Sequence, residues 1–134
     1  MDEVRIEIVG LDKLHKVLTK EAIDVAMKGM TAGVYAEAND IFNESQAQVP
    51  VATGTLRSSG EVSPPAVSAH QVSVEIGYGG AAADYALPVH EKIEAYHAPP
   101  TKAKYLEDPM IAAARGMGSR IAKYVLAELN RLRT

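Results

Sequence analysis

One segment of the sequence constrains the fold more than any other, because it predicts an unusually long helix. Between residues 11 and 48, counted at about 100° per residue, one narrow stripe is apolar and the opposite side is polar. The agreement of the two patterns over about five turns predicts a single amphipathic helix that covers a core. Pro50 ends it, because proline lacks the amide hydrogen that a helix interior needs. The apolar stripe holds Ile23, Met27, Met30, Val34, Ala38 and Ile41, and the polar side holds Glu21, Asp24, Lys28 and Asn39.

Small residues form a second line along the same helix. Ala22, Ala26, Gly29, Gly33 and Ala36 recur at spacings of four and three residues. Each glycine inside a helix costs about 0.5–1 kcal/mol relative to alanine, so the two glycines need a structural reason. Two explanations are open: another helix of the same subunit crosses closely here, or a neighbouring subunit does.

The segments around the long helix predict short strands and a connector. Residues 4–8 alternate apolar and charged side chains, which is the pattern of a half-buried strand. Residues 49–59 form a connector containing proline and glycine, in which Thr53 is the expected N-cap of a single helical turn. Residues 62–76 predict a hairpin or meander, and the glycine-rich residues 77–80 are expected to end its last strand in a turn.

The C-terminal half predicts a short helix over residues 84–91, a loop over 95–101 and a final helix. Asp108 is the expected cap of that final helix and Pro109 its first residue. The fold class is therefore α+β, with a small, mostly antiparallel β-sheet packed against a long N-terminal helix and a C-terminal helix. One domain is expected over residues 1–134. The buried stripe of the final helix is expected to hold Met110, Ala114, Met117, Ile121 and Val125.

Charge and composition argue against several classes of protein. Fourteen basic residues against 17 acidic ones give a net charge of -3, which argues against a nucleic-acid module with a broad cationic face. Arg131 and Arg133 match the dipole of the final helix rather than a DNA-binding stripe. The absence of cysteine excludes disulfides and thiolate metal sites. No apolar run approaches the roughly 20 residues that cross a bilayer, and no signal-peptide pattern opens the chain, so we expect synthesis in the cytoplasm.

The most site-like cluster is His90-Glu91 followed by His97, with His70 or Asp84 as a conceivable third ligand. Zinc proteases place two histidines four residues apart on one helix, whereas these two lie seven apart with a predicted loop between them. No phosphate-binding loop and no nucleophile elbow is present. The sequence therefore predicts no enzyme, no metal and no cofactor, and a metal-dependent hydrolase is only the alternative.

Residues 49–59 read Val-Pro-Val-Ala-Thr-Gly-Thr-Leu-Arg-Ser-Ser. This run resembles the Pro-Val-x-Thr-Gly-x-Leu-Arg-x-Ser motif of a family of small tailed-bacteriophage structural proteins, known as minor capsid, neck, tail-completion or head–tail joining proteins. The motif follows the long helix in that family, as it does here. Ala52 departs from the usual aspartate, which removes one local capping bond.

Two further motifs occur in the family's order. Residues 78–91 carry Tyr-Gly-Gly and then Asp-Tyr-Ala before Val-His-Glu, which resembles the family's Tyr-Ala-x-x-Val-His-Glu segment and includes Tyr85, His90 and Glu91. Residues 103–107 read Ala-Lys-Tyr-Leu-Glu and resemble its Ala-Lys-Phe-Leu-Glu segment, with Tyr105 in place of phenylalanine. Three motifs in order, between two long helices, make the resemblance specific. The motif residues expected to serve structure or interfaces are Thr53, Gly54, Leu56, Arg57, Tyr85, His90, Glu91, Lys104, Tyr105, Leu106 and Glu107.

The resemblance implies a structural virion protein at the head–tail junction. Such proteins form homo-oligomeric rings, hexameric or dodecameric, that contact portal-adaptor, neck and tail proteins and let DNA pass without specific binding. A tail terminator or a minor capsid protein of the same virion is the alternative within this class. No membrane and no catalysed reaction is implied.

The motif residues also suggest particular contacts. Leu56 is expected to anchor the short helical turn to the core. Arg57 needs an acidic partner if it is partly buried, and Glu91 is the predicted one, because arginine pairs well with carboxylates. Tyr85 and Tyr105 are expected to supply aromatic bulk, with their hydroxyls reaching the surface.

Overall fold

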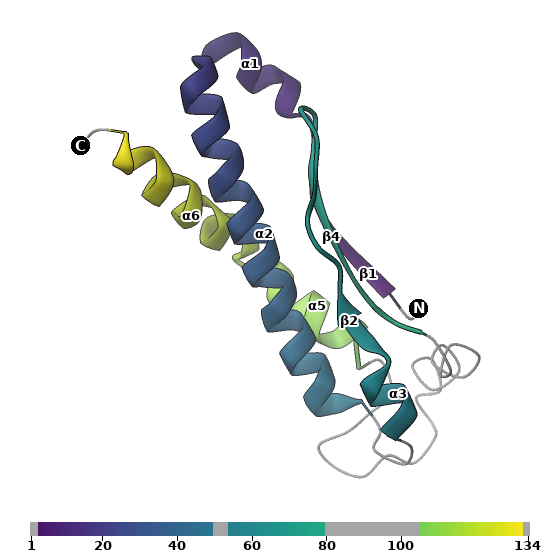
Figure 1. Ribbon diagram of the computed structural model, residues 1–134. Coiled ribbons are helices and arrows are strands. Elements are labelled where there is room, and N and C mark those ends of the chain that lie inside the picture. The colour runs from purple at the N-terminus through teal and green to yellow at the C-terminus, as the bar shows by residue number, and fades with distance from the viewer. Residues whose placement is uncertain (1–2, 50–53, 80–104, 133–134) are drawn as a thin grey trace.

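The computed structural model describes residues 3–49, 54–79 and 105–132, and it has the predicted α+β fold. A small antiparallel sheet forms one layer, and the helices lie along one side of it (Figure 1). The elements are β1 (Glu3–Ile8), a 3-10 turn η1 (Leu11–Lys13), α1 (Leu14–Val17), α2 (Lys20–Gln48), α3 (Gly54–Ser58), β2 (Gly60–Val62), β3 (Ala66–Val67), β4 (Val72–Tyr78), α5 (Glu107–Ala114) and α6 (Met117–Arg131).

The sheet is built around β4, which pairs with β1 on one side and with β2 and β3 on the other. Its order is β1-β4-β2, and every pairing is antiparallel. In the β1–β4 register Val4 lies opposite Ile76 and Ile6 opposite Val74, so the apolar side chains of both strands share the face that meets the helices. On the other face the Arg5 guanidinium hydrogen-bonds the Glu75 carboxylate. The predicted strand at residues 4–8 is thus confirmed.

Strand β4 extends further than expected. Gly77 and Tyr78 belong to the strand rather than to a turn, so the expectation that residues 77–80 break it was wrong at these two positions. The Tyr78 side chain is only 4% exposed, and its burial continues the inward alternation of Val74 and Ile76.

The long helix begins later than predicted. One helix from residue 11 was expected, but η1 and α1 come first, and the backbone at Leu18 is extended with φ -114° and ψ 152°. Helix α2 then starts anew, because the Thr19 hydroxyl accepts a hydrogen bond from the Ala22 amide at 3.1 Å and caps it. It ends at Gln48, just before Pro50, as predicted.

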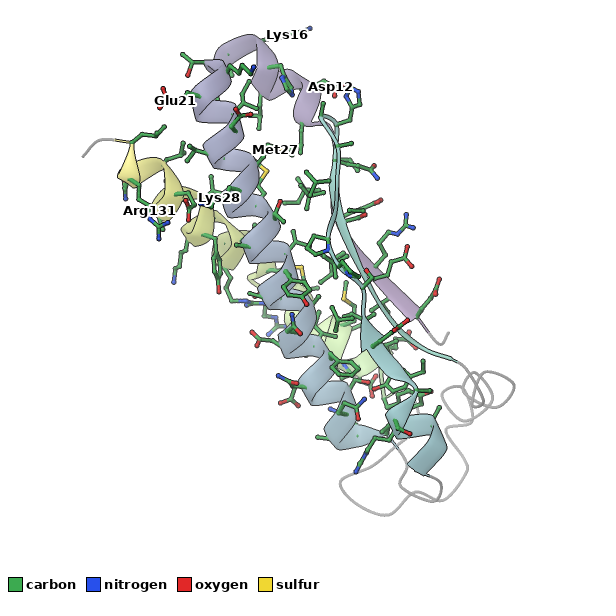
Figure 2. All side chains as sticks on the ribbon, viewed as in Figure 1. Asp12, Lys16, Glu21, Met27, Lys28 and Arg131 are labelled. Carbon is green, nitrogen blue, oxygen red and sulfur yellow. The ribbon has the colours of Figure 1, made fainter. Side chains whose placement is uncertain are left out.

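The apolar stripe of α2 faces the core as expected. Ile23, Val34, Ala38 and Ile41 are buried, and Met27 and Met30 pack against the cluster while half-buried. In Figure 2 Met27 points toward the sheet, while Glu21 points to the opposite side of α2.

The line of small residues is the crossing point of α2 and α6. A Cβ added at Gly29 would lie 2.6 Å from the Val125 Cα, and one added at Gly33 would lie 3.2 Å from the Ile121 Cα. The glycines therefore let two backbones of one chain approach closely, which is the first of the two explanations.

The C-terminal helix is two helices rather than one. Gly116 has φ +77° and separates α5 from α6, since this left-handed conformation cannot continue a helix. The expected cap was also wrong: α5 begins at Glu107, and Leu106 precedes it with no side-chain cap. Of the predicted stripe, Ile121 is buried and Met110, Met117 and Val125 are half-buried, but Ala114 is exposed because it ends α5 beside the break.

Within the described residues, no helix combines the length and the apolar character that crossing a membrane requires.

Candidate functional site

The first motif continues into the short helix α3, which follows the end of α2. Leu56 is 2% exposed and belongs to the main hydrophobic cluster, so its predicted anchoring role is confirmed. Gly54 opens α3, and the Ser58 hydroxyl donates a hydrogen bond back to the Gly54 carbonyl. Thr53, the predicted cap, lies outside the described residues.

The third motif supplies the largest fully buried side chain among the described residues. Tyr105 and Leu106 are both 0% exposed. The Tyr105 ring meets the Tyr78 ring edge-on, with 5.1 Å between centroids and 88° between planes. The Tyr105 hydroxyl therefore does not reach the surface, contrary to expectation, because its whole ring is packed inside. Glu107 opens α5, and Lys104 lies outside the described residues.

Tyr78 joins these two motifs to α2. Its hydroxyl forms a 2.7 Å hydrogen bond with the Ser45 hydroxyl inside the core. Burial raises the pKa of Tyr78, opposed by the Ser45 hydrogen bond and by the positive charge of Arg57. The positive charge of Arg57 thus lies close enough to the buried Tyr78 hydroxyl to lower its pKa.

The raised pKa of Tyr78 gives a testable pH dependence. In the unfolded chain a tyrosine ionises near pH 10, while folded Tyr78 keeps its proton to higher pH, so the free energy of unfolding should fall as pH rises above about 10. Tyr78→Phe should lose less stability over that range. Below about pH 9 it should be about 1–3 kcal/mol less stable than the wild type, because Ser45 loses a buried partner. Urea unfolding followed by circular dichroism from pH 8 to 11.5 measures both effects.

Tyr124→Phe is the control for this pH series, because Tyr124 is 42% exposed. It should follow the wild-type curve throughout. Equal alkaline slopes for Tyr78→Phe and the wild type would contradict the assignment.

The Arg57 side chain makes few hydrogen bonds to the described residues. The main-chain carbonyl of Arg57 accepts a hydrogen bond from the Gln46 side-chain amide at 3.0 Å. Its guanidinium reaches only the Val49 carbonyl, at 3.4 Å, and its buried Nε has no hydrogen-bond partner in the described part of the chain. The predicted partner Glu91 lies outside the described residues, so this ion pair stays a prediction.

The histidine cluster cannot be assembled from the described residues. His90, Glu91, His97, Asp84 and Tyr85 all lie outside them, as do the predicted helix 84–91 and loop 95–101. His70 is described, and its imidazole hydrogen-bonds the Asp12 carboxylate, which lowers the pKa of Asp12. Within the described ranges, no three His, Asp or Glu side chains gather closely enough to hold a metal ion.

A half-buried ion pair between α6 and α2 was not predicted from the sequence. The Arg120 guanidinium donates from Nη2 to the Glu37 Oε1 at 2.7 Å and from Nε to its Oε2 at 2.9 Å. The Glu37 side chain is 5% exposed and that of Arg120 43%. Arg120 also donates to the Arg115 carbonyl at 2.9 Å, so it ties the break between α5 and α6 to α2. The available signal was Glu37 itself, a carboxylate on the apolar stripe, which needs a cation if it is buried.

Comparison of the chain with family models, with curated proteins and with solved structures finds no match.

Proposed function

We propose that this chain is a structural virion protein of a tailed bacteriophage, part of the head–tail connector that joins the portal side to the tail. The proposal starts from the resemblance of residues 49–59, 78–91 and 103–107 to the motifs of that family. The order of elements agrees with it: a strand, a long helix, a short motif helix, antiparallel strands and closing helices.

One structural observation supports an assembly role most directly. Val49 and Leu56, on either side of residues 50–53, are buried in the same cluster. Tyr78 and Tyr105, on either side of residues 80–104, are in ring contact within that cluster. The described residues that flank both motif segments therefore lie in one part of the core, at the end of α2 where Ser45 bonds Tyr78. A single packed end that anchors the flanks of two motif segments suits a protein that contacts neighbouring virion proteins.

The roles of the described motif residues fit this proposal. Leu56, Tyr105 and Leu106 pack in the core instead of surrounding a pocket. Side chains of this kind position neighbouring segments and perform no chemistry themselves. The function would then reside in contacts with other copies and with neck, adaptor or tail proteins, while DNA passes through without specific binding.

Removing the gene from the phage that carries it tests the proposal. We expect DNA-filled heads and separate tails in electron micrographs, with infectious particles restored when the wild-type protein is supplied in trans. Tails of abnormal length would instead identify a tail terminator. A normal yield of complete virions would refute a connector role.

A further inference from the structure

The sheet has one long edge that is not paired within the described residues. Strand β1 spans six residues, and among the described strands it pairs only with β4. The opposite edge is short: β2 has three residues and β3 two, with Pro64 and Pro65 between them. Prolines and short strands protect an edge from pairing, and β1 has neither protection.

Two apolar hollows lie beside β1, on the side of the helices. One, of about 360 Å³, is lined by Val4 together with Met110 and Ile111 of α5. The other, of about 600 Å³, is lined by Ile6 and Ile8 together with residues of α2 and α6. Ile111 and Leu126, at the rims of the two hollows, are 63% and 58% exposed. An added strand would therefore gain both backbone hydrogen bonds and two places for inward apolar side chains.

The charges on β1 indicate which strand could be added. Glu3, Arg5 and Glu7 alternate in sign along the polar face of the sheet. We propose that β1 pairs antiparallel with β1 of a second copy of this chain, with Ile6 opposite Ile6 of that copy. Arg5 of each copy then faces Glu7 of the other, so the register forms two opposite-charge pairs.

The other registers are less favourable. Centring the pair on Arg5 places two arginines opposite each other. Centring it on Val4 keeps complementary charges but pairs only the first three residues of β1, Glu3 to Arg5. A shift by one residue would put charged side chains against the helices. In the chosen register Ile8 of the second copy lies next to Val4 and its hollow, and Val4 of that copy next to Ile8 and the other hollow.

This contact is distinct from the proposed ring. A two-fold pairing of β1 with itself closes after two copies, whereas a ring needs two different surfaces that meet head to tail. The dimer therefore does not depend on the connector role, and either proposal can fail alone.

A charge exchange across the two-fold axis tests the dimer with the full chain. Arg5→Glu and Glu7→Arg each place like charges opposite one another twice, so the dissociation constant of either variant alone should rise by at least about tenfold. A mixture of the two variants restores opposite charges at both positions and should form the heterodimer. Sedimentation velocity across a concentration series, with native mass spectrometry of the mixture, measures both. Because folding defects cannot be rescued by mixing, recovery in the mixture identifies the β1–β1 register.

The apolar part of the contact has its own matched pair of variants. Leu126→Arg, in the larger hollow, should weaken the dimer by at least about tenfold, because burying an unpaired charge opposes association. Val67→Arg, at a residue 53% exposed on the other edge, should leave it unchanged. A wild-type protein that is monomeric at every concentration would overturn the proposal. So would a dissociation constant that neither Arg5→Glu nor Glu7→Arg changes. So would a mixture that stays monomeric.

Discussion

Replacing Tyr105 by alanine should lower the free energy of unfolding by about 3–5 kcal/mol. The side chain is 0% exposed, and its ring packs edge-on against Tyr78 at 5.1 Å between centroids. Removing it leaves a cavity in the core beside the Tyr78 ring, just before the start of α5. Since domains of this size have about 5–15 kcal/mol of stability in total, the loss should be visible as a large drop in the urea midpoint.

Tyr124→Ala is the matched control for that substitution. Tyr124 is 42% exposed on α6, so the same truncation there should change stability by no more than about 0.5 kcal/mol. Equal effects at the two positions would show that Tyr105 is not packed as described.

Gly29→Ala should destabilise the fold by about 1–3 kcal/mol, although alanine is the better helix former. The added Cβ would lie 2.6 Å from the Val125 Cα and 2.8 Å from the Tyr124 carbonyl oxygen. These are backbone atoms, which no side-chain rotation can move aside, so α2 and α6 must separate. Thermal and urea unfolding of the variant measure the cost.

Gly118→Ala makes the same change where there is room. A Cβ at Gly118 meets nothing within 4 Å, so stability should be unchanged or rise by up to about 1 kcal/mol. If Gly29→Ala left the stability of the purified protein unchanged but disrupted assembly, the line of small residues would belong to a subunit interface instead.

Periodic patterns predicted the parts of this fold that bury one face. The alternation in residues 4–8 predicted a strand, which the structure has at Glu3–Ile8. The apolar stripe from Ile23 to Ile41 predicted which side of α2 is buried. Both predictions succeed because burial of one face imposes a period of two or of 3.6 residues. Pro50 also predicted the end of α2 correctly, because a proline lacks the amide hydrogen that a helix interior needs.

Breaks between helices were harder to predict, because apolar stripes continue across them. Thr19 was the visible signal for the start of α2, and Gly116 for the break before α6. Thr19 acts through a cap hydrogen bond and Gly116 through a left-handed backbone conformation. Neither local feature changes the pattern of apolar residues along the helix. The close crossing at Gly29 and Gly33 was anticipated, but only the structure identifies α6 as the partner.

The candidate site was predicted in part. Leu56 was expected in the core and is there, whereas Tyr105 was expected to reach the surface and is buried instead. The pairing of Arg57 with Glu91 stays a prediction, because only Arg57 is described, and its buried Nε has no hydrogen-bond partner among the described residues. Glu37 and Arg120 are 83 residues apart, so their pairing follows from the α2–α6 crossing and from no local pattern.

We propose that this protein lies at the junction of head and tail. Cryo-electron microscopy of purified virions of the phage that encodes it tests this most directly. We expect repeated copies around the neck, each with a rod of density for α2 beside a four-stranded sheet. Complete virions that lack the protein, or that carry it only at a site remote from the junction, would contradict the account.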